Sequence, residues 1–424
     1  MRCKDCHIAP FTPYYVLNQR TTLCEHFVLL LQILSHLPPH RLTPLSDSYP
    51  PPDQHLDMLP FLFILFSRFV SSRADTSAEP LYSNRRHNLQ YTGSGGHCSS
   101  GSDLDVTYHG GTLMTQTVKL YNIYIGHSSS DYSGSTTPAI VGTFAENLGG
   151  SRYGNIVTYY HDSTKKHPKH VNNTYTFEGD IYYSHSGSSI SDTTIADAIN
   201  FAITTNAISP DSNDIFAVFF RGDYSYYSEQ RRSSWLVDWC GIHGSVTLNG
   251  YDLVFLALGD PSFIPSSSSN KSICAPLFYG AANSSGVTYS GSSPTCNNNN
   301  NCSFIPPNGN AAVDAMISVY ASMIFETLTD TFFDGYYRDC DGAEIADLCY
   351  KNYGAIQTSG SVNFNVQMGS NKYLVQQQWL YQPNGQASAC ALGADVDSGA
   401  LTDFKVHVPA LVLLIASSFL ILAL

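Results

Sequence analysis

Four runs of apolar and β-branched residues between residues 100 and 390 predict strands. They cover residues 118–125, 155–160, 214–220 and 253–258. The last two runs are almost entirely apolar, which is typical of strands buried on both faces of a sheet. We therefore expect these two strands at the centre of a sheet.

Two other segments repeat their apolar residues with helical spacing. The first follows Asp192, which we expect to cap a helix, and its apolar face consists of Ile195, Ala198, Ile199, Ala202 and Ile203. The second is predicted from Ala311 to Leu328 with Asn310 as its cap, and its apolar stripe consists of Val313, Ile317, Tyr320, Ile324 and Leu328.

Helices that alternate with buried strands predict an α/β fold, a single layered domain with a mixed central sheet flanked by helices. Residues 265–301 are rich in Ser and Asn, show no periodicity and offer little to bury, so we expect a long loop or insertion there. Both ends of the chain resemble processing signals, so the folded part is expected to be shorter than the 424-residue chain.

The N-terminal residues are expected to lie outside the fold. Residues 1–57 contain a Pro-rich stretch and nothing that could form a core, which predicts a non-native or disordered leader. Residues 58–74 contain a short apolar core, with Ser72 and Ala74 at the spacing that signal peptidase favours. This pattern predicts a signal peptide and a mature chain that begins near Asp75. The alternative is a buried apolar segment or a signal anchor.

The C-terminal residues 409–424 form an uncharged apolar tail with no basic residue after it. Three small residues beginning at Ser398 and a polar spacer of about eight residues precede this tail, which matches a signal for a GPI lipid anchor. Residues 75–398 would then form the extracellular domain, and 399–424 would be the anchor signal. The alternative is a membrane helix, although this tail is shorter than the roughly 20 residues that span a bilayer.

Composition supports an exported protein. Only 13% of residues are charged and the formal net charge is −13, so we expect no basic surface for nucleic acid. Beyond the leader, an even number of cysteines remains, which predicts a disulfide framework of Cys98, Cys240, Cys274, Cys296, Cys302, Cys340, Cys349 and Cys390. Eight cysteines allow 105 pairings. The short separations favour Cys296 with Cys302 and Cys340 with Cys349.

Two kinds of polar motif predict exposed loops. Glycosylation sequons begin at Asn172, Asn270, Asn283 and Asn301. A basic segment holds three histidines and three lysines, and we interpret it as a solvated loop: His161, Lys165, Lys166, His167, Lys169 and His170.

Several motifs occur in the order seen in one plant family. Residues 108–114 (Tyr-His-Gly-Gly-Thr-Leu-Met), 240–245 (Cys-Gly-Ile-His-Gly-Ser) and 273–277 (Ile-Cys-Ala-Pro-Leu) resemble blocks of the EXORDIUM-like, or phosphate-induced protein 1, family. The motifs around residues 326–330, 335–337, 344–349 and 372–375, with Cys390 at the end, complete the resemblance over about residues 104–390. This resemblance implies a cell-wall location and a role in growth and nutrient responses.

The second predicted helix is similar to a zincin-like helix of non-plant relatives, which carry a His-Glu-Leu-x-Glu-x-x-Thr-Asp-Pro pattern. Here the His position holds Ser322, the general-base position holds Met323, and the Pro position holds Thr331. A zinc-activated water needs several protein ligands and a base. We therefore expect no zincin-type hydrolysis, and no catalytic residue is assigned.

A cation site remains a hypothesis. Ser322, Glu326 and Asp330 share one helix face by spacing, and Glu344 and Asp347 lie three residues apart. With His109 and His243 these acids could form a residual metal site, and an oxygen-rich set would suit Ca²⁺ better than Zn²⁺. The alternative is that the acids cap helices or form ion pairs and that both histidines are structural. No other cofactor is expected.

The sequence thus leads to a non-catalytic protein of the cell surface or cell wall, whose partner would be a wall polysaccharide or a surface protein. The first alternative is a metallohydrolase. An imidazole within about 5 Å of the Glu326 carboxylate, beside an open pocket, would favour it. The second alternative is a carbohydrate-binding protein, suggested by the 28 tyrosines that could stack on sugars.

Overall fold

A computed structural model of the chain describes Cys98 and residues 105–265, 268, 270–280, 282–298, 302–382 and 387–395. All of these belong to the unit Ser77–Leu424. The expected leader, signal peptide and anchor signal, together with Ser398 and Asn301, lie outside the described residues and stay predictions.

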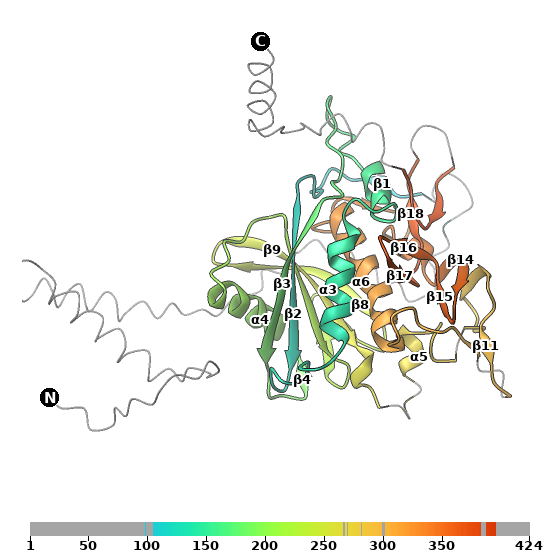
Figure 1. Ribbon diagram of the computed structural model, residues 1–424. Helices are drawn as coiled ribbons and strands as arrows, with labels where there is room; N and C mark the ends of the chain where they lie inside the picture. Colours follow the sequence, from blue (N-terminus) through green and yellow to red (C-terminus); the bar gives the residue numbers. More distant parts are fainter. Residues whose placement is uncertain are drawn as a thin grey trace, which may run out of the picture. The chain divides into compact units, whose positions relative to one another are not determined.

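A five-stranded sheet with the order β3-β2-β5-β9-β8 organises the domain (Figure 1). Four of its strands are parallel, and the edge strand β8 is antiparallel to β9. Its strands are β2 (Val118–Gly126), β3 (Tyr175–Ser184), β5 (Asp214–Arg221), β8 (Gly241–Leu248) and β9 (Tyr251–Asp260). Asn249 and Gly250 join β8 to β9 with φ angles of 54° and 84°, as the tight turn of a two-residue hairpin requires.

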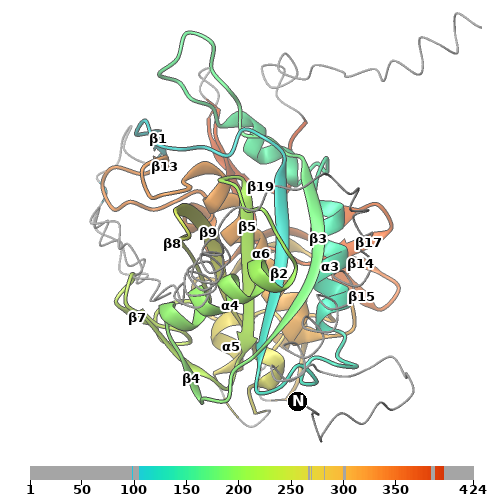
Figure 2. The same cartoon turned by 90° about the vertical axis from the view of Figure 1, so that its left-hand side faces the viewer.

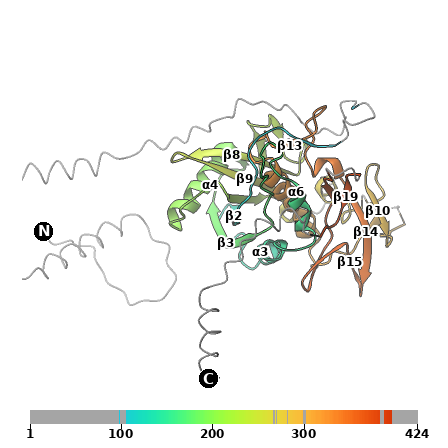
Figure 3. The same ribbon diagram turned by 90° about the horizontal axis from the view of Figure 1, so that it is seen from above.

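Helices cover both faces of this sheet. The crossover from β2 to β3 contains α3 (Thr137–Leu148), and that from β3 to β5 contains α4 (Asp192–Thr205). One buried cluster joins α3 and α6 (Ala311–Thr329) to the sheet, and a second cluster joins α4 to the opposite face. Accordingly, α4 and α6 lie on opposite sides of the strands when seen from above (Figure 3).

Strand β5 shows how the sequence pattern builds these two layers. Ile215, Ala217 and Phe219 point into the cluster with α6, while the residues between them, including Phe216 and Val218, point toward α4. Each of these side chains is fully buried. A strand covered on both faces has no polar face to alternate with its apolar one. The predictions of strands at 118–125, 214–220 and 253–258 are confirmed.

Helix α6 is the central helix of the domain. Asn310 caps it by accepting a hydrogen bond from the backbone N–H of Val313, as expected. Among the described residues, α6 alone is long and apolar enough to cross a membrane, but 83% of its most apolar window is buried inside the protein. Its apolar character is therefore that of a core helix.

The other elements are short. Most of the second half folds into two- and three-stranded sheets beside α6 (Figure 1). These elements are β1 (Thr107–Tyr108), η2 (Gly154–Tyr159), β4 (Ser189–Ile190), β6 (Ser225–Ser228), β7 (Ser233–Ser234), η3 (Pro261–Phe263), α5 (Lys271–Cys274), β10 (Thr288–Gly291), β11 (Thr295–Cys296), β12 (Cys302–Ser303), β13 (Tyr336–Tyr337), η4 (Asp347–Cys349), β14 (Asn352–Ser359), β15 (Val362–Phe364), β16 (Val366–Met368), β17 (Asn371–Tyr373), β18 (Gln378–Leu380) and β19 (Ala389–Ala391).

Three local predictions are wrong. The run 155–160 lies largely in the 3₁₀ helix η2, because a short buried apolar run does not distinguish strand from helix. Helix α4 is capped by Ser191, whose side chain accepts from the Thr194 N–H, and Asp192 is its first helical residue. The expected loop at 265–301 contains α5, β10 and β11.

All eight domain cysteines are paired, as predicted. The bridges join Cys98–Cys340, Cys240–Cys274, Cys296–Cys302 and Cys349–Cys390. The predicted bridge from Cys296 to Cys302 is confirmed, but that from Cys340 to Cys349 is wrong. Strand β1 pairs with β13, which brings the start of the domain beside Cys340 and leaves Cys349 to pair with Cys390.

Candidate functional site

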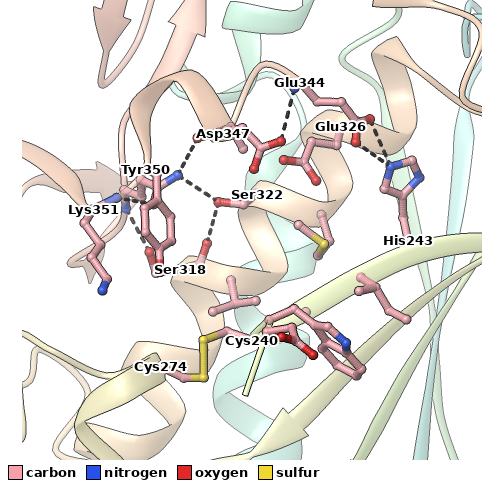
Figure 4. Close-up of a pocket in the computed structure, with 18 of the residues that line it drawn as sticks. Cys240, His243, Cys274, Ser318, Ser322, Glu326, Glu344, Asp347, Tyr350 and Lys351 are labelled. Atoms are coloured by element: carbon pink, nitrogen blue, oxygen red, sulfur yellow. Dashed lines mark hydrogen bonds and ion pairs between the residues drawn. A yellow bond between two sulfur atoms is a disulfide. The ribbon is translucent and has the colours of Figure 1, made fainter. Parts of the chain in front are cut away.

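An open pocket of about 470 Å³ lies between the edge strand β8 and helix α6. The turn between β6 and β7 and the segment after Glu344 complete its walls. The disulfide Cys240–Cys274 lines it and ties the residue just before β8 to α5 (Figure 4). A covalent tie at this place fixes one wall against another.

His243 enters this pocket from β8. Its side chain is 1% exposed, and its Nε2 lies 3.0 and 3.2 Å from the two carboxylate oxygens of Glu344. Its Nδ1 is buried without a hydrogen-bond partner. Burial, followed by the positive charge of Arg231, holds the pKa of His243 well below its usual value. The ring is therefore neutral at neutral pH.

Glu326 comes from α6 and points toward His243 and Glu344 (Figure 4). One ligand atom from each of these three residues lies within 4.8 Å of the others. The Glu326 side chain is buried, and no hydrogen bond to its carboxylate is found among the described residues. Burial, then the negative charges of Asp347 and Glu344, raises the pKa of Glu326 well above its usual value.

Two further carboxyl groups belong to the same acidic cluster. Asp347 lines the pocket and accepts a hydrogen bond from the Glu344 N–H at 3.2 Å. Burial raises the pKa of Asp347 and that of Glu344 to about 7. Asp330 is the C-cap residue of α6, and it accepts from the Gly335 N–H at 2.6 Å, so it has a structural role as well.

Ser322 does not take part in this cluster. Its hydroxyl donates to the Ser318 carbonyl at 3.2 Å and accepts from the Gln378 side-chain amide at 3.3 Å. The Gln376 amide lies 3.5 Å away on the same oxygen. Met323 lines the pocket one residue on and has no basic atom. The polar face expected from spacing therefore divides, with Ser322 turned into a buried amide network and Glu326 turned into the pocket.

His109 lies elsewhere. Its ring stacks on Tyr337 with a centroid distance of 3.6 Å, and its Nε2 lies 3.3 Å from Asp339. Neither partner lines the pocket. Of the two candidate histidines, the structure thus brings only His243 to the acids.

Arg231 is a residue of the site that the sequence patterns did not indicate. It lines the pocket, and its guanidinium lies 4.2 Å from the ring centroid of Phe333. The Phe333 ring in turn lies 4.5 Å from the His243 ring. Arg231 is a positive charge acting on all four buried ionisable groups His243, Glu326, Glu344 and Asp347.

One imidazole and two carboxylates that converge beside an open space can hold a divalent cation. The imidazole favours Zn²⁺ or Mn²⁺ over Ca²⁺, which prefers an all-oxygen shell. This differs from the expectation of a calcium site, because the sequence did not show which histidine would reach the acids. The condition set for the hydrolase alternative, an imidazole close to Glu326 in an open pocket, is met by His243.

Three of the four sequons fall on described residues. Asn270 and Asn283 are exposed, and Asn172 is half-buried. The Asn283 side chain contacts the Cys302 sulfur and accepts from the Tyr289 hydroxyl at 2.8 Å. These positions allow access to Asn270 and Asn283, and glycosylation itself stays a prediction.

Comparisons with known proteins agree with the motif order. The conserved region of phosphate-induced protein 1 matches residues 106–391. Protein EXORDIUM-like 5 of Arabidopsis thaliana is 32% identical over 106 residues, which are 22% of this chain and 28% of that relative's length. No solved structure matches the chain. Because the family match covers most of the chain, the protein belongs to the phosphate-induced protein 1 family.

Proposed function

We propose that this protein is an exported family member that binds a divalent cation at His243, Glu326 and Glu344. The observation that carries the proposal is the convergence of these three side chains within 4.8 Å in an open pocket. They come from β8, α6 and the segment after β13, so a cation would join three separate parts of the fold.

The charges in the pocket support a bound cation. Glu326 is buried without a hydrogen-bond donor, and an unpaired buried carboxylate is costly. Arg231 is the basic residue closest in influence, and it acts on the cluster from beside Phe333. A divalent ion would neutralise Glu326 and Glu344 together and accept the lone pair of the neutral His243 imidazole.

The first experiment measures cation binding to the purified, secreted protein. Calorimetric titration with Zn²⁺, Mn²⁺ and Ca²⁺ should give one equivalent of Zn²⁺ or Mn²⁺ and weaker binding of Ca²⁺. Glu326→Gln and His243→Gln should each weaken binding at least tenfold. Glu146→Gln, an exposed change on α3, is the matched control and should bind as the wild type does. Equal binding by all of these proteins would refute the site.

A metallohydrolase is the second candidate, and one observation favours it. Asp347 lines the open pocket beside the cluster and has its pKa raised to about 7, the range suited to a general base at neutral pH. It would replace the base that Met323 cannot provide. Peptide and ester hydrolysis that depends on Asp347 and on added metal would establish this reaction, whereas its absence supports a non-catalytic role.

Export, anchoring and physiological role are part of the same proposal. The signal peptide, the lipid anchor at Ser398, the sequons and the family resemblance support a glycosylated protein of the cell surface or wall with a role in growth or nutrient response. Release from cells by phosphatidylinositol phospholipase C, with an intact mass that begins near Asp75, would agree with it. Glycan-array binding tests the carbohydrate-binding alternative.

A further inference from the structure

A hairpin-like segment between η2 and β3 projects from the domain. Figure 2 shows it in green as a long loop that leaves the body beyond the sheet. Its base is held by backbone hydrogen bonds from Val171 N–H to the Tyr160 carbonyl at 2.8 Å and from Asp162 N–H to the Lys169 carbonyl at 3.1 Å. His161 and His170 face each other as an antiparallel bridge at this base.

The base is also fixed to the body of the domain. The Tyr336 hydroxyl donates to the His161 carbonyl at 2.6 Å, and His170 Nδ1 lies 2.7 Å from the Thr158 carbonyl. The Tyr160 hydroxyl donates to the Trp379 carbonyl at 2.5 Å. The segment is therefore presented in a defined place.

The tip of this segment, residues 163–169, carries concentrated positive charge. It contains three lysines, one histidine and no acidic residue, in a chain whose formal net charge is −13. Every one of these seven residues is exposed. Lys165 pairs with Asp162, but no ion pair to Lys166 or Lys169 is found in the described part of the chain. The expectation of a solvated loop is correct as far as exposure goes.

Folding stability does not account for the tip. Exposed lysines that contact nothing bury no apolar area and add nothing to the core, while like charges close together repel one another. A projecting basic tip on an acidic protein instead supplies a local attraction for a polyanion. Its chemistry narrows the kind of polyanion.

Two polyanions fit less well. A membrane-binding loop usually inserts aromatic or aliphatic side chains, and the tip has none between Ser163 and Lys169. Nucleic-acid sites usually add arginine forks or stacking aromatic rings, which the tip also lacks. What remains is a repeating set of carboxylate or sulfate charges on a hydrated chain, which lysine ammonium groups can follow without a fixed geometry.

We propose that the basic tip, residues 163–169, binds an acidic polysaccharide. Lys166 and Lys169 provide the unpaired charges, and Lys165 contributes once its bond to Asp162 is shared with the polymer. Single exposed contacts of this kind are weak, so binding depends on several charges along one polymer chain and falls steeply with salt. This proposal does not depend on the cation pocket.

The test compares two triple variants of the full secreted chain. Lys165→Gln/Lys166→Gln/Lys169→Gln removes the tip charges. Arg152→Gln/Lys271→Gln/Lys372→Gln removes the same charge from other sites and serves as the matched control. Binding to de-esterified polygalacturonate is measured against salt concentration, with dextran as the neutral polymer.

The wild type and the control should bind polygalacturonate and not dextran. The tip variant should bind at least tenfold more weakly, with its salt slope reduced by about three, about one per lysine contact. Equal losses in both variants would show a net-charge effect and overturn the proposal. Absence of wild-type binding, or binding only to vesicles containing phosphatidylserine, would also overturn it. Unchanged thermal unfolding of both variants excludes misfolding as the cause.

Discussion

The four disulfides close loops of very different length, and this difference predicts how much each stabilises the fold. Cys98 and Cys340 are separated by 242 positions, whereas Cys296 and Cys302 are separated by 6. If a bridge acts by restricting the unfolded chain, its contribution grows with the logarithm of the loop length. The two loop lengths then differ in their effect by about 3 kcal/mol at 25 °C.

The perturbation is the replacement of each pair by alanine. Cys340 is exposed, so its replacement leaves little native packing to lose, whereas Cys302 is 1% exposed and its loss adds a small packing cost to the short-loop variant. The measured difference should therefore be somewhat smaller than the difference calculated from loop length alone. The Cys98→Ala/Cys340→Ala variant should still be the less stable protein by about 2–3 kcal/mol.

The assay is urea unfolding of the two variants and the wild type, followed by fluorescence of the buried aromatic residues. The free energy of unfolding and the slope with urea are compared. Equal destabilisation by the two variants, or a larger loss in Cys296→Ala/Cys302→Ala, would refute loop closure as the source of the stability. It would indicate that native contacts around Cys302, such as that with Asn283, determine the effect.

Two further predictions concern the core and pH. Phe219→Ala removes a fully buried ring that packs on Tyr124 and Tyr320 and should cost about 3–5 kcal/mol in urea unfolding, whereas Tyr227→Ala, at 45% exposure, should change stability by less than about 0.5 kcal/mol. Burial raises the pKa of Asp314 from 3.8 to about 6. Its folded-state pKa lies above the unfolded one, so stability present below about pH 4 is lost as pH rises through 6, by roughly 3 kcal/mol. Asp314→Asn should flatten this part of the stability–pH curve; an unchanged curve would contradict it.

The sheet was predictable where a local pattern determined the outcome. The runs at 214–220 and 253–258 are apolar at nearly every position, and such runs can be accommodated only at the centre of a layered fold. The helix at Ala311 was marked by its stripe and by Asn310. In contrast, the run at 155–160 is buried in a 3₁₀ helix, because burial there comes from surrounding elements and not from a strand partner.

The site was predictable only as a set of candidates. The acids on α6 were found by spacing, but His243 and Glu344 are 101 positions apart and meet only because β8 and the segment after β13 lie on the same side of α6. The same holds for Cys98 and Cys340. Arg231 gave no signal, since its role depends on the Phe333 ring that holds it beside the pocket.

Both outer strands of the five-stranded sheet are protected against pairing with another molecule. On β8, the His243 and Ser245 carbonyls accept from the side chains of Arg231 and Gln230, so side chains occupy hydrogen-bonding positions that an incoming strand would need. On β3, the pairing with β2 is interrupted beside Gly179, whose φ is 114°.

Bare strand edges invite aggregation, and covered or irregular ones resist it. A protein held at high local density on a surface meets copies of itself constantly. In this fold, the same Arg231 that faces the acidic cluster also helps to keep neighbouring copies from joining their sheets edge to edge.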